Sequence, residues 1–260
     1  MSNVNDGGGL YDINPSNGNA TLLSHVNAGF AGIGMAYLDG TLYATDMLNY
    51  QNGGSIPAAF YVASINLLNG VVTPFTLQAG SINWHGLASD QHKNTMYAIA
   101  LDQQNTLMEI SSTGNVRAIG NAGAADGRGL VFNPYDGYLY ATSTASDSLY
   151  KINPNTAQST LVGHLGFDAT FLDLAFDIRS NVMYANVVDS ASRMGQLYLL
   201  DYHTGSSSLI GSNNSNFIEG MAWLPDLVNA VPEPETYAMM LAGLGLLGFM
   251  PRKTMAQVSV

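Results

Sequence analysis

The sequence predicts an all-β fold made of repeated four-stranded units, and three observations carry this prediction. Related lines of sequence recur at intervals of 43 to 52 residues. Within each line, short runs of Leu, Tyr, Val, Ile and Thr alternate with Asp-Gly, Asn-Gly, Thr-Gly or Asn-Pro turns, which suit two-stranded antiparallel hairpins. The acids are 15 Asp and only four Glu, and Asp favours turns whereas Glu favours helices.

The first strand of each unit alternates small and large residues, as in the stretches GMAY at residues 34–37 and GLVF at residues 129–132. Crowding near a central axis selects such an alternation. The equivalent strands are expected to begin at Gly34, Gly86, Gly129, Asp173 and, in a weaker copy, Gly220. A four-stranded repeat of about 43 residues resembles a β-propeller. A β-sandwich is the alternative, but a sandwich does not require the same pair of hairpins at near-constant spacing.

The other strands of each unit follow from the same alignment. The second strand carries a tyrosine that is expected in equivalent positions, at Tyr43, Tyr97, Tyr140 and Tyr184. The third and fourth strands form a second hairpin. These hairpins are predicted to begin at Leu10, Leu107, Leu149 and Leu197, with a looser version at Phe60.

The two ends of the chain are predicted to share a fifth blade. Residues 10–13 and 20–23 form a hairpin before the first complete unit, and residues 220–224 repeat a first strand after the last one. Residues 227–231 then supply the second strand of this blade, or else serve only as a linker. The prediction is therefore a five-bladed β-propeller over residues 1–231, in which the N-terminal and C-terminal strands close the ring and remove the exposed sheet edges.

The C-terminal segment has a different composition. Residues 237–250 contain no charge, and as a helix they would span roughly 21 Å, less than the ~30 Å hydrocarbon core of a membrane. The segment Val231-Pro232-Glu233-Pro234 comes before this run, and the basic pair Arg252-Lys253 follows it. In this order the three parts resemble the PEP-CTERM sorting signal of Gram-negative bacteria. We therefore predict a sorting tail over residues 232–260, with one short hydrophobic helix at 237–250.

The resemblance implies a cellular route for the protein. In that family an exosortase recognises the motif at the membrane and processes the tail, so a membrane-anchored precursor would be held in the inner membrane by its transmembrane helix. The mature protein would then reach the cell surface or the extracellular space. Such systems are associated with extracellular polysaccharide and biofilm. Because residues 1–9 have neither a basic start nor an apolar run, we expect a leader upstream of Met1 or a misplaced gene start.

The overall composition excludes several classes of function. The formal net charge is −11, and a surface this acidic repels phosphate backbones, so we predict no nucleic-acid partner. The chain contains no cysteine, which excludes disulfides, thiolate chemistry and Cys-ligated zinc. None of the five histidines lies in a metal-binding pattern, and calcium-loop, phosphate-loop and nucleophile-elbow motifs are all missing. We therefore predict no cofactor, no metal site and no catalytic residue, and a surface position for the histidines.

One candidate ligand-binding face follows from the repeat. By analogy with propellers, the residue before each first-strand glycine lies where the longer loops gather, and these residues are Ile33, His85, Arg128, Leu172 and Glu219. His85, Arg128 and Glu219 together suit an anionic sugar or acid–base chemistry. The alternative is an Arg128–Glu219 salt bridge that plugs the axis. Neighbouring loops are predicted to add Asp126, His164, Asp168, Tyr50 and Asn52 to this face.

Three classes of function remain open at this point. The favoured class is a surface or matrix protein whose propeller binds polysaccharide or another protein without catalysis. An alternative is a propeller lyase or hydrolase that acts on extracellular polysaccharide through His85 and its neighbours. The third class is a spacer that binds no ligand.

Overall fold

The computed structural model describes residues 9–26, 32–47, 60–75, 84–100, 102–124, 126–168, 171–189, 192, 194–216 and 220–224. By its internal contacts the chain divides into two units, Met1–Trp223 and Leu224–Val260. All the strands of the described residues lie in the first unit. The predicted sorting tail and its helix lie outside the described residues.

Four antiparallel four-stranded sheets follow one another along the chain, which confirms the all-β class and the four-stranded repeat. The first contains β3 (Gly32–Leu38), β4 (Thr41–Met47), β5 (Phe60–Ile65) and β6 (Val72–Phe75). The second contains β7 (Trp84–Asp90), β8 (Thr95–Ala100), β9 (Thr106–Ser111) and β10 (Val116–Asn121). The third contains β11 (Gly127–Asn133), β12 (Tyr138–Ser143), β13 (Ser148–Ile152) and β14 (Ser159–His164). The fourth contains β15 (Leu172–Asp177), β16 (Val182–Val188), β17 (Met194–Leu200) and β18 (Ser207–Asn216).

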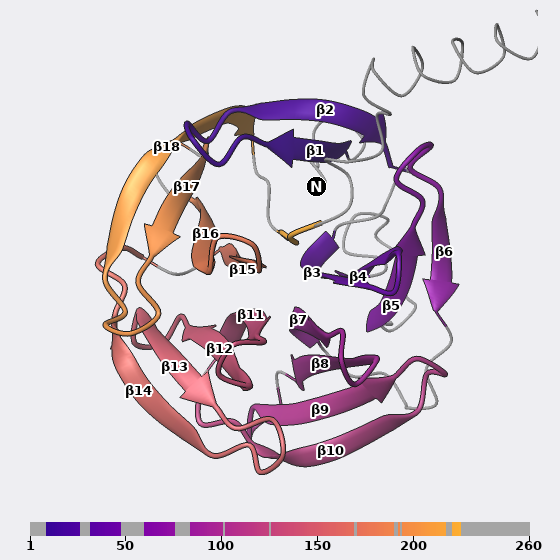
Figure 1. The fold of residues 1–260 in the computed structure, drawn as a ribbon, viewed down its shortest axis with the longest axis vertical. Helices are drawn as coiled ribbons and strands as arrows, with labels where there is room; N and C mark the ends of the chain where they lie inside the picture. The colour runs from indigo at the N-terminus through magenta and orange to yellow at the C-terminus, as the bar shows by residue number, and fades with distance from the viewer. Residues whose placement is uncertain are drawn as a thin grey trace, which may run out of the picture. The chain divides into compact units, whose positions relative to one another are not determined.

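The sheets are arranged around an axis like the blades of a propeller (Figure 1). In each blade the first strand lies innermost and the fourth outermost. A fifth, two-stranded sheet of β1 (Gly9–Ile13) and β2 (Ala20–His25) lies between β18 and β6 in the ring. The backbone of this sheet lies close to its neighbours on both sides. A Cβ atom added to Gly211 of β18 would lie only 2.0 Å from the Asn17 carbonyl oxygen. A Cβ atom added to Gly70, in the turn between β5 and β6, would lie 1.9 Å from the His25 carbonyl oxygen.

The prediction of five four-stranded blades is wrong, because the described part of the chain forms four. The predicted N-terminal hairpin is present as β1 and β2, but the described residues pair it with no further strand. Residues 220–224 were expected to form a first strand and do not. Instead of entering a sheet, this segment hydrogen-bonds to the inner ends of other blades, where the Gly220 amide donates to the Gly32 carbonyl at 3.2 Å. Residues 227–231 lie outside the described part of the chain.

The predicted register of the second strands is confirmed. Each of the four tyrosines pairs with the equivalent residue of its first strand: Tyr43 with Ala36, Tyr97 with Ala88, Tyr140 with Val131 and Tyr184 with Ala175. The repeated sequence therefore encodes a repeated geometry. Large residues of the inner strands fill the space between blades, as Leu130 does where it packs with Tyr97 and Ile99 of the preceding blade.

The surplus of Asp over Glu is explained by the hairpin turns. In the turns that follow β1, β13 and β17, the Oδ1 atoms of Asn14, Asn153 and Asp201 accept the amide of the residue two positions later at 2.8–2.9 Å. Asp90 and Asp177 do the same after the first strands. A short side chain that mimics a backbone acceptor is needed for this turn, and Glu is one carbon too long.

The outermost strand of three blades carries a bulge followed by a glycine. The register shifts just before Gly120 in β10, Gly163 in β14 and Gly211 in β18. At two of these glycines the strand passes very close to the turn of the next sheet, since a Cβ atom on Gly163 would lie 2.0 Å from the Thr204 carbonyl oxygen and one on Gly211 would lie 2.0 Å from that of Asn17. Bulges increase strand twist, and at these two positions neighbouring sheets come into backbone contact.

One buried carboxylate joins the inner ends of the blades. Asp173 of β15 is completely buried and stands where the other units have glycine. Its Oδ2 atom accepts the backbone amides of Met35 in β3 at 3.1 Å and of Met221 at 2.8 Å, while Oδ1 accepts the Leu174 amide at 2.9 Å. Burial raises the pKa of Asp173 well above its usual range, and the hydrogen bonds that it accepts oppose that rise. This carboxylate therefore holds residues 220–221 against the ring.

Candidate functional site

The predicted ligand face begins at the loop end of the inner strands, where β7 and β11 carry His85 and Arg128. Both strands lose their pairing at these residues. The register jumps from Trp84 to Leu87 in β7 and from Gly127 to Leu130 in β11. Bulges of this kind redirect side chains, and here they turn Arg128 toward His85 on the neighbouring blade.

Arg128, His85 and Asp126 form one connected group. The Arg128 Nη1 atom lies 2.8 Å from His85 Nδ1, and its Nε atom lies 3.5 Å from the Asp126 Oδ1 atom. At that distance the second contact is an ion pair, because Nε makes no hydrogen bond within the described residues. Asp126 is itself held by the Thr144 hydroxyl. The Arg128 side chain is 24% exposed, although its Nε atom is buried.

His85 is neutral at physiological pH. Burial, followed by the positive charge of Arg128, lowers its pKa to about 3, and Asp126 opposes this shift. Because a guanidinium group only donates hydrogen bonds, His85 Nδ1 must be the acceptor, and the proton of the neutral ring lies on Nε2. His85 is only 3% exposed, so the expectation of a surface position is wrong for this histidine. His25, His92, His164 and His203 are exposed, as expected.

Two further predicted site residues, His164 and Asp168, belong to β14 and to the loop after it. His164 lies at the end of β14, the outermost strand of its blade, where its Nδ1 atom lies 2.9 Å from the Ser148 hydroxyl. Asp168 is exposed in the loop that follows. The strand order β11-β12-β13-β14 places His164 on the outermost strand of the blade whose innermost strand carries Arg128. That His164 and Asp168 share one site with Arg128 stays a prediction.

Three of the predicted site residues lie outside the part of the chain that the structure describes: Tyr50, Asn52 and Glu219. The alternative of an Arg128–Glu219 salt bridge is therefore untested. The described members of the predicted inner ring are Ile33, His85, Arg128 and Leu172, of which the last is buried and apolar. Within the described residues, no three His, Asp or Glu side chains lie close enough together to hold a metal ion.

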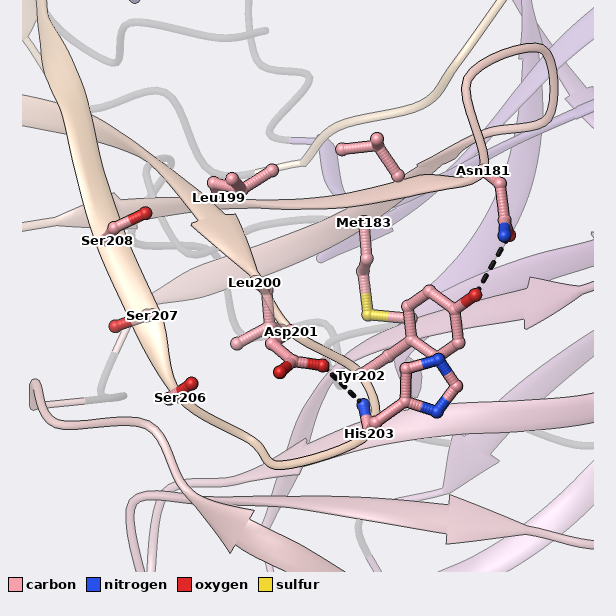
Figure 2. Close-up of a pocket in the computed structure, with 11 residues that line it drawn as sticks. Asn181, Met183, Leu199, Leu200, Asp201, Tyr202, His203, Ser206, Ser207 and Ser208 are labelled. Carbon is pink, nitrogen blue, oxygen red and sulfur yellow. Dashed lines mark hydrogen bonds between the residues drawn. The ribbon is translucent and has the colours of Figure 1, made fainter.

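Sequence reasoning missed a pocket at the opposite end of the fourth blade. It has a volume of about 390 Å³ and lies between the turn after β15 and the turn after β17 (Figure 2). Met183 and Leu200 lie at its buried side, and Tyr202, His203 and Asp201 lie along the turn. A sequence signal for it exists, because the Asn-Pro of the turns after β1 and β13 is replaced here by Asp201-Tyr202-His203.

Comparison with solved structures gives the same class of fold. A chain of a nidogen/laminin complex is 18% identical and superposes with a TM-score of 0.53, covering 79% of this chain and 73% of that one. A protein of unknown function from Bacteroides thetaiotaomicron is 14% identical with a TM-score of 0.51, covering 76% of this chain and 46% of that one. Identities this low show the fold alone. The protein is thus an all-β, propeller-like repeat protein.

The tail gives the more specific identification. Residues 230–253 match the PEP-CTERM protein-sorting motif, so the chain carries this signal directly after its propeller-like unit. The motif implies export, sorting to the cell surface and processing by an exosortase. An uncharacterized protein of Dictyostelium discoideum is 26% identical over 105 residues, which is 38% of this chain. The matched segment spans 30% of that relative's length. In the part of the chain that the structure describes, no helix is both long enough and apolar enough to cross a membrane.

Proposed function

We propose that the protein is an exported surface or matrix protein whose propeller binds extracellular polysaccharide without catalysis. The precursor is anchored in the inner membrane through residues 237–250 until its tail is processed. The observation that carries the proposal is the hydrogen bond between Arg128 and His85 Nδ1 at the loop end of the ring. It bears on both the ligand and the absence of catalysis.

The ligand class follows from Arg128. A guanidinium group recognises carboxylates through paired, charge-assisted hydrogen bonds, and His85 and Asp126 fix its orientation from two sides. A polysaccharide that carries uronic acids supplies such carboxylates. The net charge of −11 repels a polyanion at long range, but salt screens that repulsion beyond about 8 Å under physiological conditions. At short range the attraction between the Arg128 guanidinium and a carboxylate of the polymer then dominates.

The same hydrogen bond argues for binding rather than bond cleavage. A general base needs a free lone pair within reach of the substrate. The Nδ1 lone pair of neutral His85 is occupied by Arg128, and its Nε2 atom carries the proton. His85 thus positions Arg128 and has no free lone pair with which to accept a proton.

Replacing Arg128 with Gln is expected to weaken binding of a uronic-acid oligosaccharide about tenfold or more, since a charge-assisted hydrogen bond is lost. Isothermal titration calorimetry with a hexuronate oligomer measures this directly. Arg179→Gln is the matched control, because it removes the same charge from an exposed turn at the other end of the strands. Equal binding by both variants would contradict the role of Arg128, and release of new reducing ends from the oligomer would contradict the absence of catalysis.

The sorting route gives a separate prediction. Replacing Pro232, Glu233 and Pro234 with Ala is expected to leave the precursor uncleaved in the membrane fraction, because the motif that the exosortase recognises is removed. Mass spectrometry of the C-terminal peptide from membrane and surface fractions distinguishes the two forms. A wild-type surface protein that still ends in Val260 would show that the tail is not processed.

A further inference from the structure

The pocket of the fourth blade forms at the hairpin end of the strands, away from Arg128. β15 begins at the loop end with Leu172 and runs to the turn at residues 178–181, and β17 ends at the turn of residues 201–206. The pocket lies between these two turns. The pocket is therefore separated from the proposed polysaccharide contact by the length of the blade. A ligand could bind in it whether or not Arg128 binds polysaccharide.

The pocket is held in place by its own hydrogen bonds and by ring packing. The Tyr202 hydroxyl donates to Asn181 Oδ1 at 2.9 Å, and the Asp201 Oδ1 atom accepts the His203 amide at 2.8 Å (Figure 2). The Tyr202 ring also packs edge-on against Tyr140 at 5.6 Å and Phe176 at 5.7 Å between centroids. Because these side chains are already held in place, a ligand loses less binding free energy to ordering them.

An aromatic surface remains exposed above this support. The His203 ring lies 4.3 Å from the Tyr202 ring, measured between centroids, and His203 itself is exposed. Figure 2 shows the two rings side by side at one end of the pocket. The buried side of the pocket is apolar, because Met183 and Leu200 are 0% and 2% exposed. Flat aromatic and apolar surfaces suit the C–H face of a sugar ring.

The polar side chains around the pocket are short and offer several hydrogen-bond donors and acceptors. Asn181, Asp201, Ser206 and Ser208 line it, and no Lys or Arg does. Amides and hydroxyls both donate and accept, and a carboxylate oxygen retains a second lone pair after accepting one bond. This combination fits the hydroxyl groups of a neutral ligand. Asp201 is the lining carboxylate, and the described lining contains no Lys or Arg, so the pocket disfavours anions.

The local sequence shows that the rings are not required by the turn. The turns after β1 and β13 have the same side-chain to amide hydrogen bond, made by Asn14 and Asn153. There the two following residues are Pro15-Ser16 and Pro154-Asn155. The fourth blade has kept the turn and replaced these residues with Tyr202-His203. The volume of about 390 Å³ also falls within the usual range for small-molecule sites.

From these observations we infer that the pocket between the turns of β15–β16 and β17–β18 is a binding site for a neutral saccharide. The saccharide stacks on His203 and Tyr202 and hydrogen-bonds to Asn181, Asp201 and the serines of β18. A ligand at this end and a carboxylate-bearing polymer at the other would give the propeller two contacts of different chemistry.

The test uses the full-length chain with methyl-labelled methionine, so that the Met183 methyl group reports on the floor of the pocket. The probes are four neutral tetrasaccharides, built from glucose, mannose, galactose or N-acetylglucosamine, and one hexuronate tetrasaccharide. We expect at least one neutral probe to shift the Met183 resonance in a saturable way. His203→Asn, which copies Asn155 of the equivalent turn, is expected to raise its Kd about tenfold.

Two controls separate this site from the loop end and from loss of folding. His92→Asn changes an exposed turn histidine of another blade and is expected to leave the Kd unchanged, as is Arg128→Gln. Thermal melting of His203→Asn should match that of the parent chain, because the side chain is exposed. The inference is overturned if no neutral probe moves the Met183 resonance, if His203→Asn binds as well as the parent, or if only the hexuronate moves it.

Discussion

Replacing Asp173 with Gly is expected to destabilise the protein, although glycine is the residue that every other unit has at this position. A consensus argument predicts the opposite effect. The glycine variant leaves the buried amides of Met35 and Met221 without their acceptor, and each such loss costs about 1–3 kcal/mol. Chemical denaturation should therefore show a loss on the order of 2–6 kcal/mol. An unchanged or higher free energy of unfolding would contradict the role of Asp173 as a clamp.

Asp173→Asn tests the charge state of the same group. The folded state raises the pKa of this carboxyl, so it holds the proton more tightly than the unfolded chain does. The contribution of protonated Asp173 to stability is thus fully present below the unfolded pKa, about 4, and is lost as the pH rises through the folded pKa. We expect the difference in unfolding free energy between wild type and Asp173→Asn to change across this window. The wild type should become less stable relative to the variant as the pH rises. A difference that does not vary with pH would show that the proton is not involved.

The second large effect is expected at the glycines of the outermost strands. Gly163→Ala places a Cβ atom 2.0 Å from the Thr204 carbonyl oxygen and 3.0 Å from its carbonyl carbon, both in the backbone of the next blade. Backbone atoms cannot rotate away as a side chain does, so the blades must separate or β14 must shift. We expect a loss of about 3 kcal/mol or more, at or above the upper end of ordinary overpacking, measured by chemical denaturation.

Gly120→Ala is the matched control for this prediction. Gly120 follows the corresponding bulge in β10, but a Cβ atom there would meet Ala157 Cβ at 3.3 Å and the Thr156 carbonyl oxygen at 3.4 Å. That contact requires only a small adjustment, and alanine restricts the unfolded chain, so the change is expected to stay below about 1 kcal/mol. Equal losses at the two positions would show that the close approach between blades does not determine the effect.

The fold was predictable wherever the sequence repeats itself. The tyrosines of the second strands occupy equivalent positions because each unit has the same alternation of apolar residues and turns. The blade count failed at the one unit whose repeat is weak. The stretch from Gly220 to Trp223 resembles a first strand, but it forms no strand, and its amides bond to the Gly32 carbonyl at the start of β3 and to the Asp173 side chain. Alignment shows that a segment is similar in sequence to a first strand. It does not show which hydrogen-bond acceptors the backbone amides of that segment will meet.

The candidate site was predictable only in part, for a related reason. The position of Arg128 and His85 at the inner loop end follows from the repeat. Their hydrogen bond depends on two bulges and on contact between separate blades, which the spacing of residues does not encode. His164 was grouped with them because it is close in sequence to a loop on the same side. Membership of a loop does not give the distance of a residue from the axis. Tyr202 and His203 could have been noticed, because they stand where two other turns have Pro followed by a small polar residue.

The hydrogen bonds of Asp173 also have a consequence for the order of folding. Asp173 is 138 residues from Met35 and 48 residues from Met221, so the ring closes through contacts that are far apart in the chain. Such contacts form slowly, and synthesis delivers the N-terminal part of a chain first. Blades built from local hairpins can therefore assemble while the chain is still emerging, but the clamp must wait for Met221, which emerges last of the three. We therefore expect an open ring, in which Asp173 has not yet met Met221, to precede the closed one, and in an exported protein we expect this closure to follow transport across the membrane.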